Sequence, residues 1–259
     1  MERLWRGTGP AYELPWGGRT WTLRVDDPRP GLRSEGIEAG PFLGLEGVAE
    51  RGRWDPDALS GATLVGHECR LGRVEATYAP PGWGDLSVRA AWSPQADDGI
   101  DLQIQINALS VGRLRAVEVK LASVLGAAAA GSPRQVEPRD ARSAGLSYDG
   151  REPDLHGLIT LPPGGPGSFA PLVLPAAGLE GWRYAEMVHP EDVSRRILEG
   201  GPAPQPCGAI RCGLFGYDLE RGVVLRARLR GLWLRAEGAE AATRARFEQF
   251  VREPLPLMT

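Results

Sequence analysis

Residues 99–108 read Gly-Ile-Asp-Leu-Gln-Ile-Gln-Ile-Asn-Ala. Here the apolar residues Leu102, Ile104 and Ile106 alternate with polar ones, which is the period of a strand that buries one face. The same alternation appears at residues 20–25, 74–78, 86–92 and 117–121. Antiparallel sheets commonly bury one face and expose the other, so this patterning predicts a fold made of antiparallel sheets.

The longest alternating segment lies late in the chain. Its apolar positions are Val223, Leu225, Ala227 and Leu229. Arginines take three alternate positions, Arg226, Arg228 and Arg230. After Gly231 the apolar residues are Leu232 and Leu234, so the parity changes by one, as it does at a β-bulge. We expect one long strand bent at Gly231, with the arginines on a solvated face or, alternatively, holding an anionic sugar such as a uronate.

Turn and cap signals complete the pattern of elements. Gly17-Gly18 and residues 219–222 suit tight hairpins. Short helices are expected at residues 55–59 and 190–198, a longer one at 239–252, and long loops at 126–145, 162–167 and 200–206. The sequence therefore predicts an all-β fold, a single antiparallel β-sandwich with a short C-terminal helix, in one domain over residues 1–259.

Composition narrows the classes of function. The 259 residues are 42% hydrophobic and 24% charged with a net charge of −3, which is typical of a soluble globule and gives no basic face for nucleic acid. Lys120 is the only lysine among 30 cations. No segment suits a membrane span or a leader, and three cysteines without a CxxC pair indicate neither a disulfide framework nor a zinc site. We expect a cytoplasmic protein without metal or cofactor, and edge pairing of long strands makes a homodimer possible.

A family resemblance enters at residues 73–92 and 98–110. The first run ends in Ala90-Ala91-Trp92, and the second ends in Asn107-Ala108-Leu109-Ser110. Over about residues 64–125 this pattern of strands and turns resembles the middle strands of the galactose-mutarotase-like super-sandwich. That superfamily includes aldose 1-epimerases, polysaccharide lyase domains and non-catalytic sugar binders. The resemblance implies a mutarotase-like sandwich. However, the His-x-Tyr-Phe-Asn context of the epimerases is absent around His67, His156 and His189.

The segment from Gly181 to Asp192 holds the main candidate site. If it is a strand, Trp182, Tyr184 and Glu186 share one face. Aromatic rings stack on sugar C–H faces, and carboxylates accept hydrogen bonds from sugar hydroxyls. A glutamate among aromatics can also have its pKa raised toward a useful acid/base value. His189 would reach the same cleft through a turn at Pro190. The alternative is that the two aromatic residues belong to the core and Glu186 pairs with an arginine.

Other candidates are weaker. His67 stands beside Glu68 in a predicted hairpin, with Arg73 close by as a substrate-binding residue, although neighbours on a strand face opposite ways. The polar loop from Tyr148 to His156 has oxygens and an imidazole that a metal could use, but without a recognised spacing. Asp218 is expected to be a turn residue.

These observations predict a protein that binds a small or oligomeric saccharide in a concave sheet face. Aldose 1-epimerase-like chemistry would use Glu186 as base and His189 or His67 as acid, with Trp182, Tyr184 and Arg73 holding the sugar. The alternatives are a non-catalytic carbohydrate-binding or structural sandwich, and a polysaccharide-lyase-like enzyme.

Overall fold

The computed structural model describes residues 4–38, 40–51, 53–70, 72–96, 99–109, 113–126, 159–161, 171–199 and 208–254. Within these residues the chain forms three antiparallel sheets and one helix, α1 (Ala239–Arg252). The predicted all-β sandwich with a short C-terminal helix is confirmed, and the predicted bounds of that helix agree with the structure.

The strands fall into a seven-stranded, a six-stranded and a three-stranded sheet. The seven-stranded sheet has, in order, β12 (Leu172–Leu174), β13 (Trp182–Val188), β16 (Val224–Arg235), β9 (Gly99–Ala108), β8 (Leu86–Pro94), β7 (Arg73–Tyr78) and β6 (Leu64–Arg70). The six-stranded sheet has β11 (Ile159–Leu161), β14 (Val193–Glu199), β15 (Ala209–Glu220), β10 (Arg113–Val124), β4 (Gly44–Glu50) and β5 (Arg53–Asp55). The third has β1 (Ala11–Trp16), β2 (Arg19–Arg24) and β3 (Arg33–Ser34).

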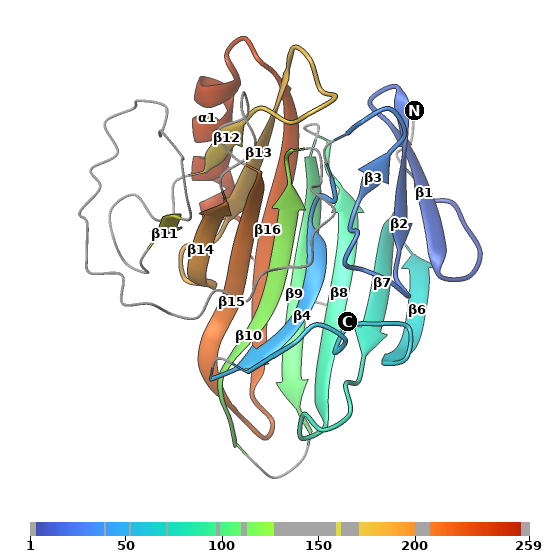
Figure 1. Ribbon diagram of the computed structural model, residues 1–259, viewed down its shortest axis with the longest axis vertical. Helices are drawn as coiled ribbons and strands as arrows, with labels where there is room; N and C mark the ends of the chain where they lie inside the picture. Colours follow the sequence, from blue (N-terminus) through green and yellow to red (C-terminus); the bar gives the residue numbers. More distant parts are fainter. Residues whose placement is uncertain are drawn as a thin grey trace.

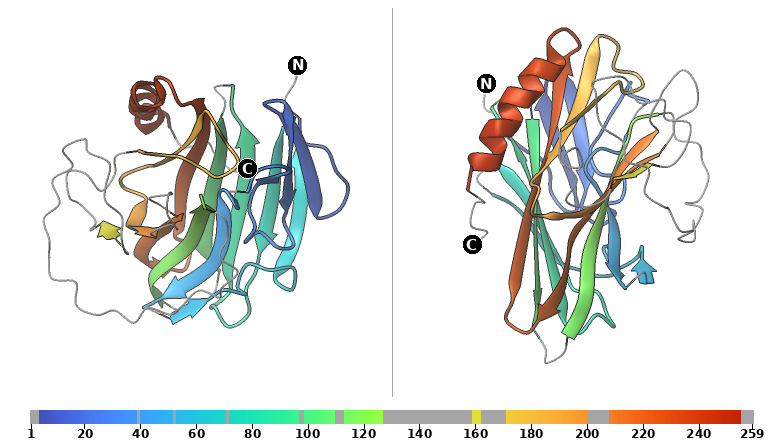
Figure 2. Two further views of the ribbon diagram at one scale, coloured as in Figure 1. Left: turned by 45° about the horizontal axis from the view of Figure 1, so that its top comes forward. Right: turned by 90° about the vertical axis from the view of Figure 1, so that its left-hand side faces the viewer.

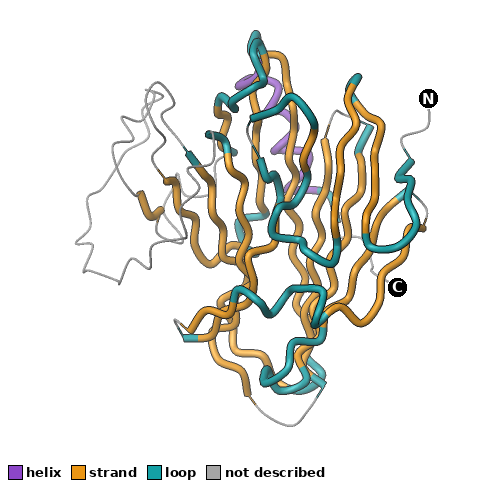
Figure 3. Tube along the Cα trace, turned by 45° about the vertical axis from the view of Figure 1, so that its right-hand side comes forward, coloured by secondary structure: helices purple, strands orange, loops and turns teal. Residues whose placement is uncertain are grey.

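The two large sheets lie face to face, with the six-stranded sheet in front of the seven-stranded sheet in Figure 1. Helix α1 covers the outer side of β12 and β13, and the edge-on view of Figure 2 places it on the far side from β10 and β15. The N-terminal sheet stands beside the six-stranded sheet (Figure 1), and the tube in Figure 3 shows helix α1 behind the strands. Its Trp21 ring lies 4.7 Å from that of Trp233 on β16, so one core joins the three sheets.

The first hairpin shows how the local sequence sets the register. Gly17 and Gly18 form the two-residue connection between β1 and β2, with φ of 63° and 74°. Two consecutive residues with positive φ match the type I′ turn, whose twist fits that of the flanking strands. The pairing of Leu14 with Trp21 follows from this turn.

The β-bulge expected at Gly231 is absent from strand β16. This strand pairs with β13 and β9 without any shift of register, so it is regular through Gly231. Gly231 faces the interior, where an added Cβ would lie 2.8 Å from the Tyr184 hydroxyl. Leu232 and Leu234 lie on the outer face in a second apolar cluster with Phe250 of α1. The pattern inverted because a helix covers the outer face there, not because the strand bends.

Two expected short helices are absent from the described residues. Residues 193–199 form β14, which pairs with β15 and β11, and residues 56–60 form turns. Pairing on both sides of a central strand outweighs the weak helical signal of residues 190–198. The expected loops at 162–167 and 200–206 lie outside the described residues, as does all of the loop at 126–145 except its first residue. Among the described residues, no helix is both long and apolar enough to cross a membrane.

Candidate functional site

Tyr184 and Glu186 share one face of β13, as the sequence predicted. The Tyr184 hydroxyl donates a hydrogen bond of 2.9 Å to Glu186 Oε2. However, Tyr184 is 0% exposed and Glu186 only 3% exposed, because the six-stranded sheet covers this side of β13. Both residues therefore lie in the interior and not in an open cleft, which corrects the prediction of a sugar site at these two positions.

The carboxyl group of Glu186 belongs to a polar cluster between the two large sheets. Ser123 of β10 donates a 2.6 Å hydrogen bond to Glu186 Oε2, and Cys212 of β15 donates to Oε1 at 3.7 Å. Burial raises the pKa of the Glu186 carboxyl, while the hydrogen bond from Ser123 and the charge of Arg196 lower it. This is a satisfied buried network, the arrangement that buried polar groups generally adopt.

Trp182 lies at the margin of the same strand and is half-buried. The Arg235 guanidinium stands 4.1 Å from the centroid of its ring. A cation already occupies one face of this ring, so the expected row of Trp182, Tyr184 and Glu186 does not form a stacking surface.

Neither His189 nor His67 shares a site with Glu186. His189 follows β13 in the turn to β14, where it lines a surface hollow with Asp192 and Arg228. His67 lies on the edge strand β6, five strand spacings away from β13, or about 24 Å at the usual strand spacing. Its Nδ1 lies 2.8 Å from the Tyr12 hydroxyl. The structure does not bring either histidine to Glu186, so the predicted acid/base pairs are not assembled. His156 lies outside the described residues.

Arg73 lies on the outer side of β7, where it forms an ion pair with Glu75. Arg89 of β8 binds the other oxygen of the same carboxylate, at 2.5 Å. Glu75 is thus clamped between two arginines, and Arg73 shares no site with the other predicted residues.

The outer face of the six-stranded sheet carries a cluster of charged side chains that the sequence analysis did not select. We call this cluster the charged face; it consists of Glu46, Glu118, Lys120, Arg195, Glu199 and Arg211. These residues come from four adjacent strands, β4, β10, β15 and β14. Three carboxylates meet three cations there.

Lys120 is central to the charged face. Its Cα partners on the two neighbouring strands are both glycines, Gly213 of β15 and Gly47 of β4. Its ammonium contacts the Glu118 carboxylate, and its side chain is 12% exposed. Glycine within a strand often marks a place where another backbone approaches closely, and at Gly47 an added Cβ would overlap the Asp55 backbone oxygen.

The Glu118 carboxylate connects three neighbours. Oε1 accepts a 2.5 Å hydrogen bond from the Ser194 hydroxyl, and Oε2 lies 3.1 Å from Arg195 as well as contacting Lys120. An added Cβ at Gly213 would lie 2.8 Å from Ser194 Oγ and 3.1 Å from Glu118 Oε1. The missing side chain at Gly213 is therefore what allows the serine and the carboxylate to meet.

Arg211 connects the remaining acids. It contacts Glu46 on one side, and its Nε donates a 2.7 Å hydrogen bond to Glu199 on the other. Partial burial lowers the pKa of the Arg211 guanidinium and raises that of the Glu199 carboxyl. Trp54 of β5 is half-buried at the margin of this sheet and donates from Nε1 to the backbone oxygen of Glu46 at 3.1 Å. The arrangement offers charged donors and acceptors side by side, with an aromatic ring at its edge.

One signal in the sequence could have pointed to the charged face. In a chain with 29 arginines, Lys120 is the single lysine, and it alternates with Glu118 on a strand. The partners on β4, β14 and β15 are distant in sequence and were not recognisable by spacing. Among the described residues, no group of three or more His, Cys, Asp or Glu could hold a metal ion.

Comparisons with known proteins define no family for this chain. No family model matches the sequence, and no curated protein matches it significantly. Among solved structures, the chain is similar to a proposed aldose 1-epimerase from Klebsiella pneumoniae, with a TM-score of 0.43 and 9% identity over 96% of this chain and 86% of that one. It is also similar to the protein HI1317, with a TM-score of 0.41 and 8% identity over 90% and 100% of the two chains. At these values neither likeness assigns an activity.

Proposed function

We propose that the protein binds a saccharide on the charged face. The observation that carries the proposal is the meeting of Glu118, Lys120 and Arg195 on the outer face of the six-stranded sheet, where the Arg195 side chain is 43% exposed. A sugar hydroxyl both donates and accepts hydrogen bonds, so it fits a surface where carboxylates and cations alternate. Trp54 adds a ring on which the C–H face of a sugar can stack.

Binding without catalysis is the better-supported form of this function. Sugar epimerisation needs a proton donor and a proton acceptor that reach one substrate. His67 and His189 both lie away from the charged face, on β6 and in the β13–β14 turn. An aldose 1-epimerase-like reaction is the second candidate, because the contact between Glu118 and Lys120 places a proton acceptor and a proton donor together.

Calorimetric titration with a panel of neutral and uronic sugars tests the proposal. Lys120→Met and Arg195→Gln should each weaken binding by about tenfold, equivalent to about 1.4 kcal/mol, because each removes a charged donor. Glu240→Gln, at an exposed position of α1, serves as the matched control and should leave the affinity unchanged. Failure of every sugar to bind, or binding that survives both variants unaltered, would overturn the proposal.

Optical rotation separates the two candidates. Fresh α-D-glucose and α-D-galactose are followed with and without the protein. A binder leaves the rate of mutarotation unchanged, whereas an epimerase accelerates it and loses the acceleration in Glu118→Gln. The Glu186→Gln variant completes the comparison, since Glu186 is buried and should not affect the rate directly.

A further inference from the structure

The charged side chains on the outer face of the seven-stranded sheet are paired along β16 and β9. Arg230 Nε donates to Asp101 Oδ1 at 2.5 Å, and Arg228 Nη1 donates to Glu253 Oε2 at 3.1 Å. The Arg228 backbone amide also donates to Asp192 Oδ2, at 3.3 Å. These charges neutralise one another within the chain. At β6, the strand at the far end of the sheet, this pairing stops.

Strand β6 is a long open edge of the seven-stranded sheet (Figure 1). It has seven residues, whereas β12 at the other edge has three. Residues 65–70 are all exposed, and an added Cβ at Gly66 would meet nothing within 4 Å. Apart from the ladder with β7, no backbone hydrogen bond joins β6 to another part of the described chain. Such an edge presents amide and carbonyl groups with which another strand can pair.

The ladder between β6 and β7 places like charges opposite each other. Glu68 is the Cα partner of Glu75, and Arg70 is the Cα partner of Arg73. Like charges directly opposite one another destabilise a strand pair. For Glu75 the repulsion is offset, because Arg73 and Arg89 both bind its carboxylate. Within the described residues, neither Glu68 nor Arg70 forms an ion pair or a side-chain hydrogen bond, so both charges are open to a partner.

The order Glu68-Cys69-Arg70 is complementary to itself when two copies of the strand run antiparallel. A two-fold axis that keeps every side chain on its own face of the sheet places one residue opposite its own copy. With Cys69 at that axis, Glu68 lies opposite Arg70 of the partner subunit, and the same contact occurs twice. No other centre within β6 places opposite charges across the two strands. Opposite charges in this position stabilise a strand pair.

We propose that two copies of this chain associate through β6, antiparallel about Cys69, so that their seven-stranded sheets become continuous. Main-chain hydrogen bonds between the two edges give the affinity, and the two ion pairs fix the register. A second copy fits this edge better than an unrelated peptide, because the charge pattern complements itself. The shared stretch is short, so the dimer is weak and dissociable rather than permanent. This surface is separate from the charged face, which lies on the six-stranded sheet.

Sedimentation of the full chain at rising concentrations tests the proposal. Glu68→Arg and Arg70→Glu should each weaken the association about tenfold, because each replaces two attractive contacts by two repulsive ones. The variant that carries both changes exchanges the charges and should recover the affinity of the parent. A residue that acted only on the fold of its own chain would not give this recovery.

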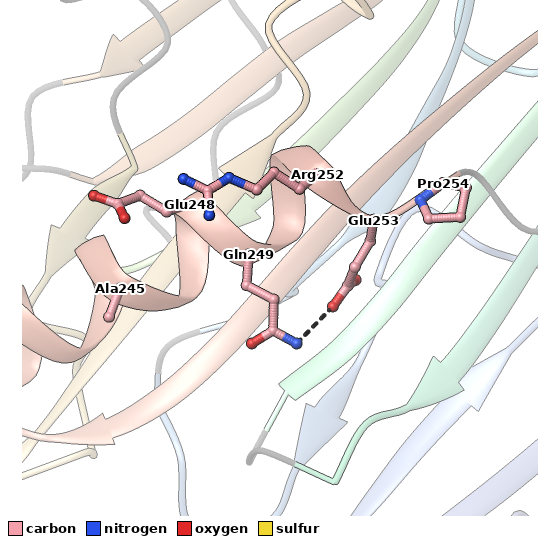
Figure 4. A pocket seen from close by; sticks show the side chains of 6 residues that line it. All are labelled: Ala245, Glu248, Gln249, Arg252, Glu253 and Pro254. Carbon is pink, nitrogen blue, oxygen red and sulfur yellow. Dashed lines mark hydrogen bonds between the residues drawn. The ribbon is translucent and has the colours of Figure 1, made fainter.

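Helix α1, at the other edge of the same sheet, provides the matched controls. Glu248 and Arg252 are exposed there, one turn apart (Figure 4). Glu248→Arg and Arg252→Glu make the same changes of net charge as the two β6 variants. They should leave the association unaltered, because the proposed contact does not include the helix.

Cys69 reports the register independently. The experiment uses the Cys207→Ser background, in which Cys212 is buried and Cys69 is exposed. Opposed residues on antiparallel strands have Cβ atoms about 4.5–5.5 Å apart, so an added oxidant should link two chains through Cys69. The link should be lost in Cys69→Ser. A chain that stays monomeric at every concentration would overturn the proposal. A double variant as weak as the single ones, or a dimer that Cys69 does not link, would do the same.

Discussion

At the scale of single residues, the partly buried carboxylate of Asp192 lowers the stability of the folded protein. Burial raises the pKa of its carboxyl to about 6, against about 3.9 in an unfolded chain. As pH rises from about 4 to 6, the unfolded chain ionises this group before the folded protein does. The raised pKa therefore destabilises the fold above pH 6 and has no effect below about pH 4.

Asp192→Asn should remove this cost. Asparagine can still accept the Arg228 amide, so the variant should be more stable than the parent above pH 6 by about 1–2 kcal/mol, a figure reduced for partial solvent screening. At pH 4 the two proteins should be equally stable. Urea denaturation at both pH values measures the difference. A variant that is less stable at pH 7.5 would show that the charge of Asp192 is itself needed by the fold.

The two described cysteines should differ sharply in reactivity. Cys69 is exposed on β6, whereas Cys212 is buried beside Glu186 and has its pKa raised by burial to about 12. Only a thiolate reacts readily, so Cys212 should be inert in the native protein. A thiol-titration reagent should modify Cys69 at once and Cys212 only after denaturant is added. The measurement uses the Cys207→Ser background, since Cys207 lies outside the described residues.

At the scale of elements, Phe250 packs helix α1 against β13 and β16 of the seven-stranded sheet. Phe250 is 0% exposed, and the Arg228 guanidinium lies 4.2 Å from its ring centroid. Phe250→Ala should lower the free energy of unfolding by about 3–5 kcal/mol, because it empties a packed site and uncovers Arg228. Hydrogen exchange over residues 239–252 should quicken at the same time. Glu240→Gln, on the exposed side of the helix, should change stability by less than about 0.5 kcal/mol.

Elements with a strong local signal were predictable from the sequence. The alternation in β9, the Gly17-Gly18 turn and the Phe247–Phe250 face of α1 all depend on neighbours in the chain. The errors arose where a distant element decided the pattern. Helix α1 inverts the expected parity after Gly231, and pairing with β15 turns residues 193–199 into a strand.

At the scale of the whole molecule, the candidate site was harder to predict than the fold. Alternation indicated that Tyr184 and Glu186 share a face, but only the stacking of the second sheet decides whether that face is open or covered. The charged face needed four strands to be placed in order, since Glu46 and Arg211 are far apart in sequence. Period-two patterning contains no information about that order.

One apolar core links the three sheets, and it predicts a single unfolding unit. Trp16, Trp21 and Trp233 are packed together across the N-terminal sheet and β16. The tryptophan fluorescence and the far-ultraviolet circular dichroism should therefore change together in one urea transition. Two separated transitions would show that the N-terminal sheet unfolds independently. The possible homodimer stays a prediction, which light scattering of the purified protein can measure.

The single lysine turns one peptide bond into a reporter. A protease that cuts only after lysine can cleave this chain at one place, between Lys120 and Leu121, in the middle of β10. That strand pairs with β15 and β4, so the bond is closed to a protease while the sheet is intact. The rate at which the two fragments appear then measures how often the centre of the six-stranded sheet opens. The measurement needs no label and no substitution.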